Sequence, residues 1–304
     1  MRNIPVRQLL LCAALGAACI GTPDDGVLPL SAAGGGLSER WELDAASTRP
    51  SNYIRSHRQN YALLGRWSDD PNQEVLDGAA GGVTSAQLDS VELEYQLSFK
   101  VKLVEDALFG GDVWAAYNQL SHWQAYNWNQ SAPFRETNYE PELIWTLPLD
   151  EKLLGLRARM INLGFSHQSN GRGEPLSRSW NRLWAQAGLE RGPLSLLVRG
   201  WWRIPESDSD DNNPDIERYM GYGDVLGVYR YEQHLFTLLV RHNLDLDDGR
   251  GAAQFDWSFP LTESENGGGL RGYIQVFSGY GETLLDYDHS QTAIGLGIIL
   301  VDAL

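Results

Sequence analysis

The clearest pattern in this chain is a strict alternation of apolar and polar residues over positions 91–103. Apolar side chains, beginning with Val91 and ending with Leu103, alternate there with polar ones such as Glu92 and Lys100. Neighbouring side chains of a β-strand point to opposite faces, so a period of two predicts a strand, and strands of globular proteins average only ~5–6 residues. Further segments of similar length bring the total to about twelve: residues 61–67, 91–103, 113–124, 138–149, 157–169, 179–188, 194–203, 220–230, 234–244, 252–261, 270–280 and 291–304.

These segments predict an all-β chain, an antiparallel transmembrane β-barrel with about twelve strands. Barrels of bacterial outer membranes have an even number of strands of ~10 residues with an apolar outer face. We find no convincing helical stretch in the mature chain. The eleven Trp and thirteen Tyr residues fit the aromatic girdles of such proteins. The chain also ends on a strand, as outer-membrane proteins typically do, although many finish with Phe or Trp and this one with Leu304.

The N-terminus predicts export. Arg2 and Arg7 precede an apolar run over residues 9–20, which is too short to span a bilayer, and the small residues 16–18 near its end form a plausible cleavage site. We therefore expect a signal peptide over residues 1–20, a flexible leader or irregular plug over residues 21–50, and the barrel domain over residues 51–304. Cleavage ranks ahead of lipid attachment at Cys19, and with Cys12 also in this segment the mature chain would have no disulfide.

Two polar residues continue the apolar face of one strand. Ile161, Leu163 and Phe165 alternate with polar or small residues, and His167 and Ser169 follow on the same face. A serine beside a histidine can act as a nucleophile with its base. On a barrel wall this face looks at lipid, so the pair favours an enzyme that acts on membrane lipid over a channel, whose working residues would line the lumen.

Other classes of function fit the sequence less well. The formal net charge of −16 argues against nucleic acid as a partner. A soluble esterase would be expected to carry a Gly-x-Ser-x-Gly motif, which is not found here. A barrel without enzymatic activity, or a small passive pore, remains the alternative. Against a pore, Glu92, Glu94, Lys100 and Lys102 share the interior face, where they could pair and plug the lumen.

Four long stretches resemble the outer membrane phospholipase A family, the calcium-dependent phospholipases of Gram-negative outer membranes. They are residues 131–141 (SAPFRETNYEP), 167–182 (HQSNGRGEPLSRSWNR), 213–222 (NPDIERYMGY) and 278–287 (SGYGETLLDY). The resemblance implies a phospholipase A1 and A2, with lysophospholipase activity, located in the cell outer membrane. Its substrates would be phospholipids and lysophospholipids.

By this resemblance Ser169 is the nucleophile, His167 its base and Asn181 the third member of the catalytic triad. The Gly171 N–H would help to stabilise the oxyanion. The resemblance also implies a Ca²⁺ site made by the Ser177 hydroxyl and the Arg172 carbonyl, hard oxygen ligands of the kind that calcium prefers.

The resemblance further implies an active homodimer, in which Ser131 of one subunit completes the calcium site of the other. Gln119 on the outer face would pair across the dimer, because a lipid-facing amide is costly without a partner; the alternative is that Gln119 points into the lumen. Two departures concern a second calcium site. Glu174 stands where the family commonly has Asp, and the acidic loop at residues 208–213 is longer than expected.

Overall fold

The computed structural model describes residues 36–49, 53–73, 87–207, 209–262 and 270–301. The chain divides into two units, Met1–Ser31 and Ala32–Leu304, and every described residue belongs to the second. The expected signal peptide therefore lies outside the described residues. The elements are α2 (Leu37–Trp41), β1 (Ile54–Ser56), β2 (Asn60–Ser68), β3 (Val91–Val104), η1 (Leu108–Gly110), β4 (Asp112–Trp123), η2 (Trp128–Gln130), β5 (Phe134–Leu153), β6 (Leu156–Ser169), β7 (Ser179–Arg191), β8 (Leu194–Ile204), α4 (Ile216–Met220), β9 (Gly223–Tyr231), β10 (His234–His242), β11 (Gly251–Pro260), β12 (Arg271–Tyr280) and β13 (Ser290–Val301).

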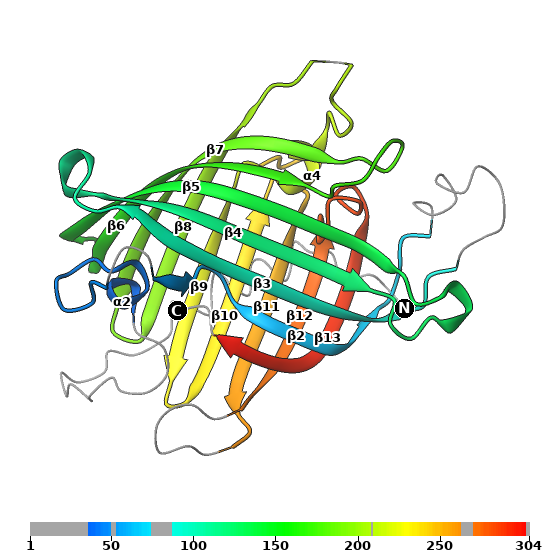
Figure 1. Cartoon of the computed structure of the whole chain (residues 1–304), viewed down its shortest axis with the longest axis horizontal. Helices are drawn as coiled ribbons and strands as arrows, with labels where there is room; N and C mark the ends of the chain where they lie inside the picture. Colours follow the sequence, from blue (N-terminus) through cyan, green and yellow to red (C-terminus); the bar gives the residue numbers. More distant parts are fainter. Residues whose placement is uncertain (1–35, 50–52, 74–86, 208, 263–269, 302–304) are drawn as a thin grey trace. The chain divides into compact units, whose positions relative to one another are not determined.

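Twelve antiparallel strands, β2 to β13, form one closed barrel. Each strand pairs with the next along the chain, and β13 returns to pair with β2, so that Ala293 lies opposite Ser68. Figure 1 shows this closure, where the red β13 runs beside the light blue β2. The short β1 adds to the edge of β3. Each of the twelve strand segments expected from the alternating pattern corresponds to one strand of the barrel, and the predicted fold is confirmed.

The wall of the barrel has one apolar and one polar face. On β3, Leu97 and Phe99 are 47% and 43% exposed, whereas Lys100 between Phe99 and Val101 is 0% exposed. The interior position predicted for the charged residues of β3 is therefore confirmed. Glu92 and Lys102 form ion pairs with other elements rather than with each other: Glu92 contacts Arg135 at 2.8 Å, and Lys102 contacts Asp112 at 2.6 Å.

The two rims of the barrel differ in the length of their loops. On one rim β5 and β6 join through residues 154–155, β7 and β8 through residues 192–193, and β9 and β10 through residues 232–233. The other rim carries longer connections, including residues 124–133, 170–178 and 205–222. Outer-membrane barrels have short periplasmic turns and longer extracellular loops, so the strand ends at Ser169 and Ser179 lie on the extracellular rim.

Part of the expected leader is helical and packs against the barrel. The N–H of Leu37 at the start of α2 donates to Oε1 of Glu190 at 2.7 Å. Trp41 packs edge-on against Trp114, and the Nζ atom of Lys100 lies 3.2 Å from the centre of the Trp41 ring. Glu42 then forms an ion pair with Lys102 at 3.0 Å.

The expectation of no helix in the mature chain was thus wrong for two five-residue elements, α2 and α4. Both are too short to show a helical period, and their buried contacts are with strands distant in sequence. Among the described residues, no helix is long and apolar enough to cross a membrane.

Candidate active site on the outer face

The hairpin of β6 and β7 brings His167 and Asn181 together. The register of the two strands pairs these residues directly, and Nδ1 of His167 lies 2.9 Å from Oδ1 of Asn181. Because an amide oxygen only accepts, His167 donates from Nδ1 and keeps Nε2 available as a base. Ser169 lies two residues further along β6 on the same face as His167.

This pair faces away from the lumen, as predicted. Along β6 the residues Ile161, Leu163 and Phe165 are exposed, whereas Asn162 and Ser166, which follow Ile161 and Phe165 on the opposite face, are fully buried. His167 and Ser169 continue the exposed set and are half-buried. A substrate ester in the surrounding lipid could therefore approach both side chains without entering the barrel.

Asn170 holds the loop that follows Ser169 in a closed shape. Its Oδ1 accepts hydrogen bonds from the N–H groups of Arg172 at 3.2 Å and Arg178 at 3.1 Å, and its Nδ2 donates to the carbonyl of Leu176 at 2.8 Å. Its own N–H donates to the carbonyl of Arg178 at 3.0 Å. One buried amide thus fixes both ends and the middle of residues 170–178.

Gly171 follows Asn170 in a backbone conformation that favours glycine, with φ at +64°. A Cβ atom at this position would lie 3.2 Å from the ring of Tyr139. Tyr139 is also the residue of β5 paired with Ser169. Tyr139 therefore lies next to both Gly171, the predicted oxyanion donor, and Ser169, the predicted nucleophile.

The two predicted calcium ligands of this loop have different surroundings. The Ser177 hydroxyl accepts a hydrogen bond from Nδ2 of Asn212 at 3.0 Å, and the same Nδ2 lies 3.5 Å from Oε1 of Glu174. The side chain of Arg172 reaches the start of β5, where it donates to the carbonyls of Phe134 and Arg135. The long acidic loop therefore contacts the predicted calcium loop through Asn212.

Ser131 lies on the neighbouring loop of the same rim, not in the 170–178 loop. It caps η2 in the left-handed region with φ at +61°, and its side chain is exposed. It comes three residues before Phe134, whose carbonyl Arg172 contacts. This outward position is compatible with a ligand donated to another molecule.

Gln119 points to the outer face, so the alternative of a lumen position was wrong. Its neighbour Asn118 is buried in the interior. The Gln119 amide is surrounded by hydroxyl groups of the outer face. It accepts from Tyr117 at 3.0 Å and donates to Ser121 at 3.2 Å and Tyr95 at 3.5 Å. These contacts lower the cost of placing the amide against lipid before any partner arrives.

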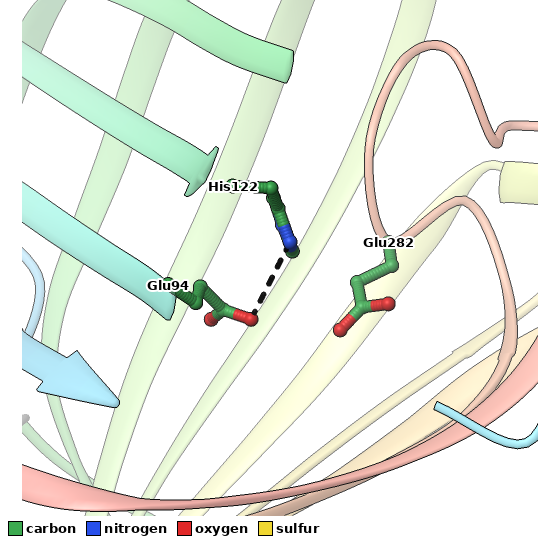
Figure 2. Close-up of side chains that lie close together, drawn as sticks. All are labelled: Glu94, His122 and Glu282. Atoms are coloured by element: carbon green, nitrogen blue, oxygen red, sulfur yellow. Dashed lines mark ion pairs between the residues drawn. The ribbon is translucent and has the colours of Figure 1, made fainter. Parts of the chain in front are cut away.

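A second polar cluster lies inside the barrel, below the same rim. Figure 2 shows Glu94, His122 and Glu282 turned toward one another. The Oε2 atom of Glu94 lies 3.8 Å from Nδ1 of His122. One possible ligand atom from each lies within 4.8 Å of the others, a spacing that a metal ion could use. Arg66, however, already contacts both carboxylates, Glu94 at 3.1 Å and Glu282 at 3.0 Å. We therefore assign this cluster to the ion-pair network of the lumen.

The same network reaches the rim of the candidate site through Asp286. This carboxylate contacts Arg135 at 2.6 Å and accepts a hydrogen bond from Thr283 at 2.9 Å. Burial raises the pKa of Asp286, but the charge of Arg135 and these hydrogen bonds outweigh it and hold that pKa below its usual value. Glu136, the residue after Arg135 on β5, contacts Arg172 in the 170–178 loop at 3.5 Å.

Sequence reasoning missed three residues of the site: Asn170, Glu206 and Asn212. Asn170 lies inside a recognised stretch, directly before Gly171, and an asparagine at such a position commonly forms hydrogen bonds to the backbone of its own turn. Asn212 was in a loop that we noticed only for its charge. Glu206 contacts Asn181 across 25 residues of sequence, and no local pattern predicts such a contact.

The sequence comparisons agree with this geometry. The family model described as Phospholipase A1 matches residues 37–300. A phospholipase A1 from Klebsiella pneumoniae is 37% identical over 81% of this chain and 82% of its own length. Its counterpart from Escherichia coli K12 is 38% identical over 80% of each chain.

A solved structure agrees as well. Outer membrane phospholipase A from Escherichia coli superposes with a TM-score of 0.75 at 34% identity, over 83% of this chain and 99% of that one. The similarity therefore covers the whole twelve-stranded barrel as well as the candidate site.

Proposed function

The chain belongs to the phospholipase A1 family of Gram-negative outer membranes, and we propose that it hydrolyses phospholipid acyl esters with Ser169, His167 and Asn181. As a member of that family it is an ester hydrolase built as an outer-membrane β-barrel. The proposal extends to both acyl positions and to lysophospholipids. The observation that carries it is the 2.9 Å contact between His167 and Asn181, with Ser169 beside them on the lipid-facing wall.

The reaction would begin when Nε2 of His167 takes the proton of the Ser169 hydroxyl. The Ser169 oxygen then attacks the ester carbonyl carbon, and the oxyanion that forms is stabilised by the Gly171 N–H. When this intermediate collapses, His167 returns the proton to the leaving lysophospholipid or glycerol oxygen. Water, activated by the same imidazole, hydrolyses the acyl-enzyme and releases the fatty acid.

The donor set of the 170–178 loop fits calcium. The Ser177 hydroxyl keeps a lone pair after it accepts from Asn212, and the side chain of Arg172 is held at β5, away from its own carbonyl. Both would supply hard oxygens, with Ser131 from a second subunit. Calcium bound there would polarise the ester carbonyl and stabilise negative charge.

A homodimer is the corresponding assembly. A Salmonella typhi outer membrane phospholipase, 34% identical with a TM-score of 0.75 over 83% of this chain, has been solved as a dimer with bound calcium. In this chain, Gln119 on the outer face and exposed Ser131 at the rim support the same arrangement. Dependence on a second subunit would keep monomers inactive toward the cell's own membrane.

The test is release of fatty acid from mixed phospholipid–detergent micelles, with calcium or with chelator. We expect calcium-dependent release by the wild type and none by Ser169→Ala. Ser166→Ala is the matched control, because this serine lies on the same strand but is fully buried on the lumen side. Release that survives in Ser169→Ala would exclude the assigned nucleophile, and no release by a folded wild-type dimer in calcium would exclude the proposed activity.

A further inference from the structure

The amide of Asn181 is held from both ends. Its Oδ1 lies 2.9 Å from Nδ1 of His167, and its Nδ2 donates to Oε1 of Glu206 at 2.9 Å. An ionised carboxylate only accepts hydrogen bonds, so the NH₂ end of the amide must face Glu206. The oxygen end is then directed to His167, which fixes the imidazole proton on Nδ1 and leaves Nε2 as the base.

The fold places Glu206 there through the pairing of β7 with β8. Asn181 is paired with Ile204, the last residue of β8, and the chain leaves the strand through Pro205. Proline restricts the backbone, and Glu206 directly follows it beside the Asn181 amide. Glu206 is half-buried on the rim, where surrounding protein and lipid weaken the screening of its charge by water.

We propose that Glu206 is a positioning residue that extends the catalytic triad, and that it supplies the negative charge that Asn181 lacks. This inference rests on the proposed function. His167 becomes positively charged when it takes the Ser169 proton, and a neutral amide stabilises that charge less than a carboxylate would. A carboxylate bound to the far end of the amide polarises it and lies one side chain away from the imidazolium.

The first measurements are kcat and KM for micellar phospholipid at saturating calcium. Glu206→Gln keeps a hydrogen-bond acceptor but removes the charge, and we expect kcat to fall about tenfold with KM unchanged. Glu206→Ala also removes the hydrogen-bond acceptor, and its kcat should fall further. The control is Glu217→Gln, a carboxylate in the same rim loop, on α4, which should leave both constants unchanged.

A charge-relocation cycle separates the electrostatic role from a purely structural one. Asn181→Asp alone would place two carboxylates in contact and should be less active than the wild type. Combined with Glu206→Gln, it leaves a single carboxylate, now bonded directly to His167, and the double variant should be more active than either single variant. The proposal would be overturned if the activity loss of the double variant equalled the product of the two single losses. It would also be overturned if Glu206→Gln were fully active.

A second readout does not depend on lipid hydrolysis. The rate at which an alkyl sulfonyl fluoride labels Ser169 reports the nucleophilicity of the serine itself. It should follow the same order across the variants. If the wild type is labelled but releases no fatty acid, the proposed function fails while the labelling rates still decide the role of Glu206. If Glu206→Gln is labelled as fast as the wild type, the role of Glu206 is excluded.

Discussion

Gln119 and Ser169 lie in one row across the outer face of the barrel, with Tyr139 between them. Neighbouring strands are ~4.8 Å apart, so the backbones of the two residues are roughly 10 Å apart. The surface around Gln119 is therefore continuous with the surface around the candidate nucleophile. A second subunit seated on Gln119 would border the active site and help to enclose its substrate.

The first prediction concerns this interface. Gln119→Leu should fold normally, since leucine suits a lipid-facing position, but it should weaken the proposed calcium-induced dimer about tenfold, the effect expected if the contact contributes ~1–2 kcal/mol as polar contacts between transmembrane helices do in model peptides. Sedimentation in detergent with calcium measures the association. Gln186→Ala, a change to a glutamine that lines the interior cavity, is the control. An unchanged dimer in Gln119→Leu would exclude the glutamine from the interface.

The second prediction concerns the proposed division of one calcium site between two subunits. Ser131→Ala and Ser169→Ala should each be inactive as homodimers, for lack of a calcium ligand and of the nucleophile. A mixed dimer contains one site with both serines intact. Random mixing of the two variants should therefore restore about a quarter of wild-type activity, because half of the dimers are mixed and each has one complete site.

The measurement is fatty-acid release after the two variants are unfolded together, refolded and supplied with calcium. Mixing after separate refolding provides a control for the rate of subunit exchange. If the mixture stays inactive although mixed dimers form, Ser131 acts in its own subunit or not at all.

The third prediction concerns the closure of the calcium loop. Asn170→Asp keeps the oxygen that accepts from Arg172 and Arg178 but replaces the donor that faces the Leu176 carbonyl. We expect the calcium concentration for half-maximal activity to rise about tenfold, with activity largely recovered at saturating calcium. A calcium titration of fatty-acid release measures this. Equal loss at every calcium concentration would instead indicate damage to the catalytic groups.

The fourth prediction concerns stability in acid. The pKa of Asp286 is held below its usual value in the folded protein, so this group stabilises the fold above its unfolded pKa of ~3.9, and the contribution is lost as the pH falls through the lower folded pKa. Asp286→Asn should therefore be less stable than the wild type at pH 7, with a difference that narrows below about pH 4. Urea unfolding followed by tryptophan fluorescence measures the free energy of unfolding of the two proteins at each pH. If the difference in unfolding free energy between wild type and Asp286→Asn were the same at pH 7 and pH 3, the stabilising role of the ionised Asp286 would be contradicted.

Local periodicity was sufficient for the barrel and for the orientation of its side chains. The alternation of Ile161, Leu163 and Phe165 predicts correctly that His167 and Ser169 face outward, because the period of two continues into the polar residues. It gave no information on β1 or α2, which have only three and five residues and are stabilised by contacts with β3 and β7.

The supporting contacts of the site could not be predicted for a related reason. Asn170, Asn212 and Glu206 lie in irregular loops, where the direction of a side chain depends on the whole path of the backbone. Glu206 reaches Asn181 only because β8 ends opposite it. Such contacts depend on strand register and loop length together, and neither can be predicted from a short segment of sequence.

The alternation of faces along β6 has a consequence for how this protein can change. Ser166 and Gln168 belong to the interior face, whereas His167 and Ser169 belong to the outer face and to the proposed catalytic set, although all four are consecutive in sequence. Substitutions in the interior set could widen the lumen into a conducting pore while the ester-cleaving surface is kept. A single inserted residue in this strand would do the opposite, since it would exchange the two sets and turn the proposed catalytic pair toward the barrel interior.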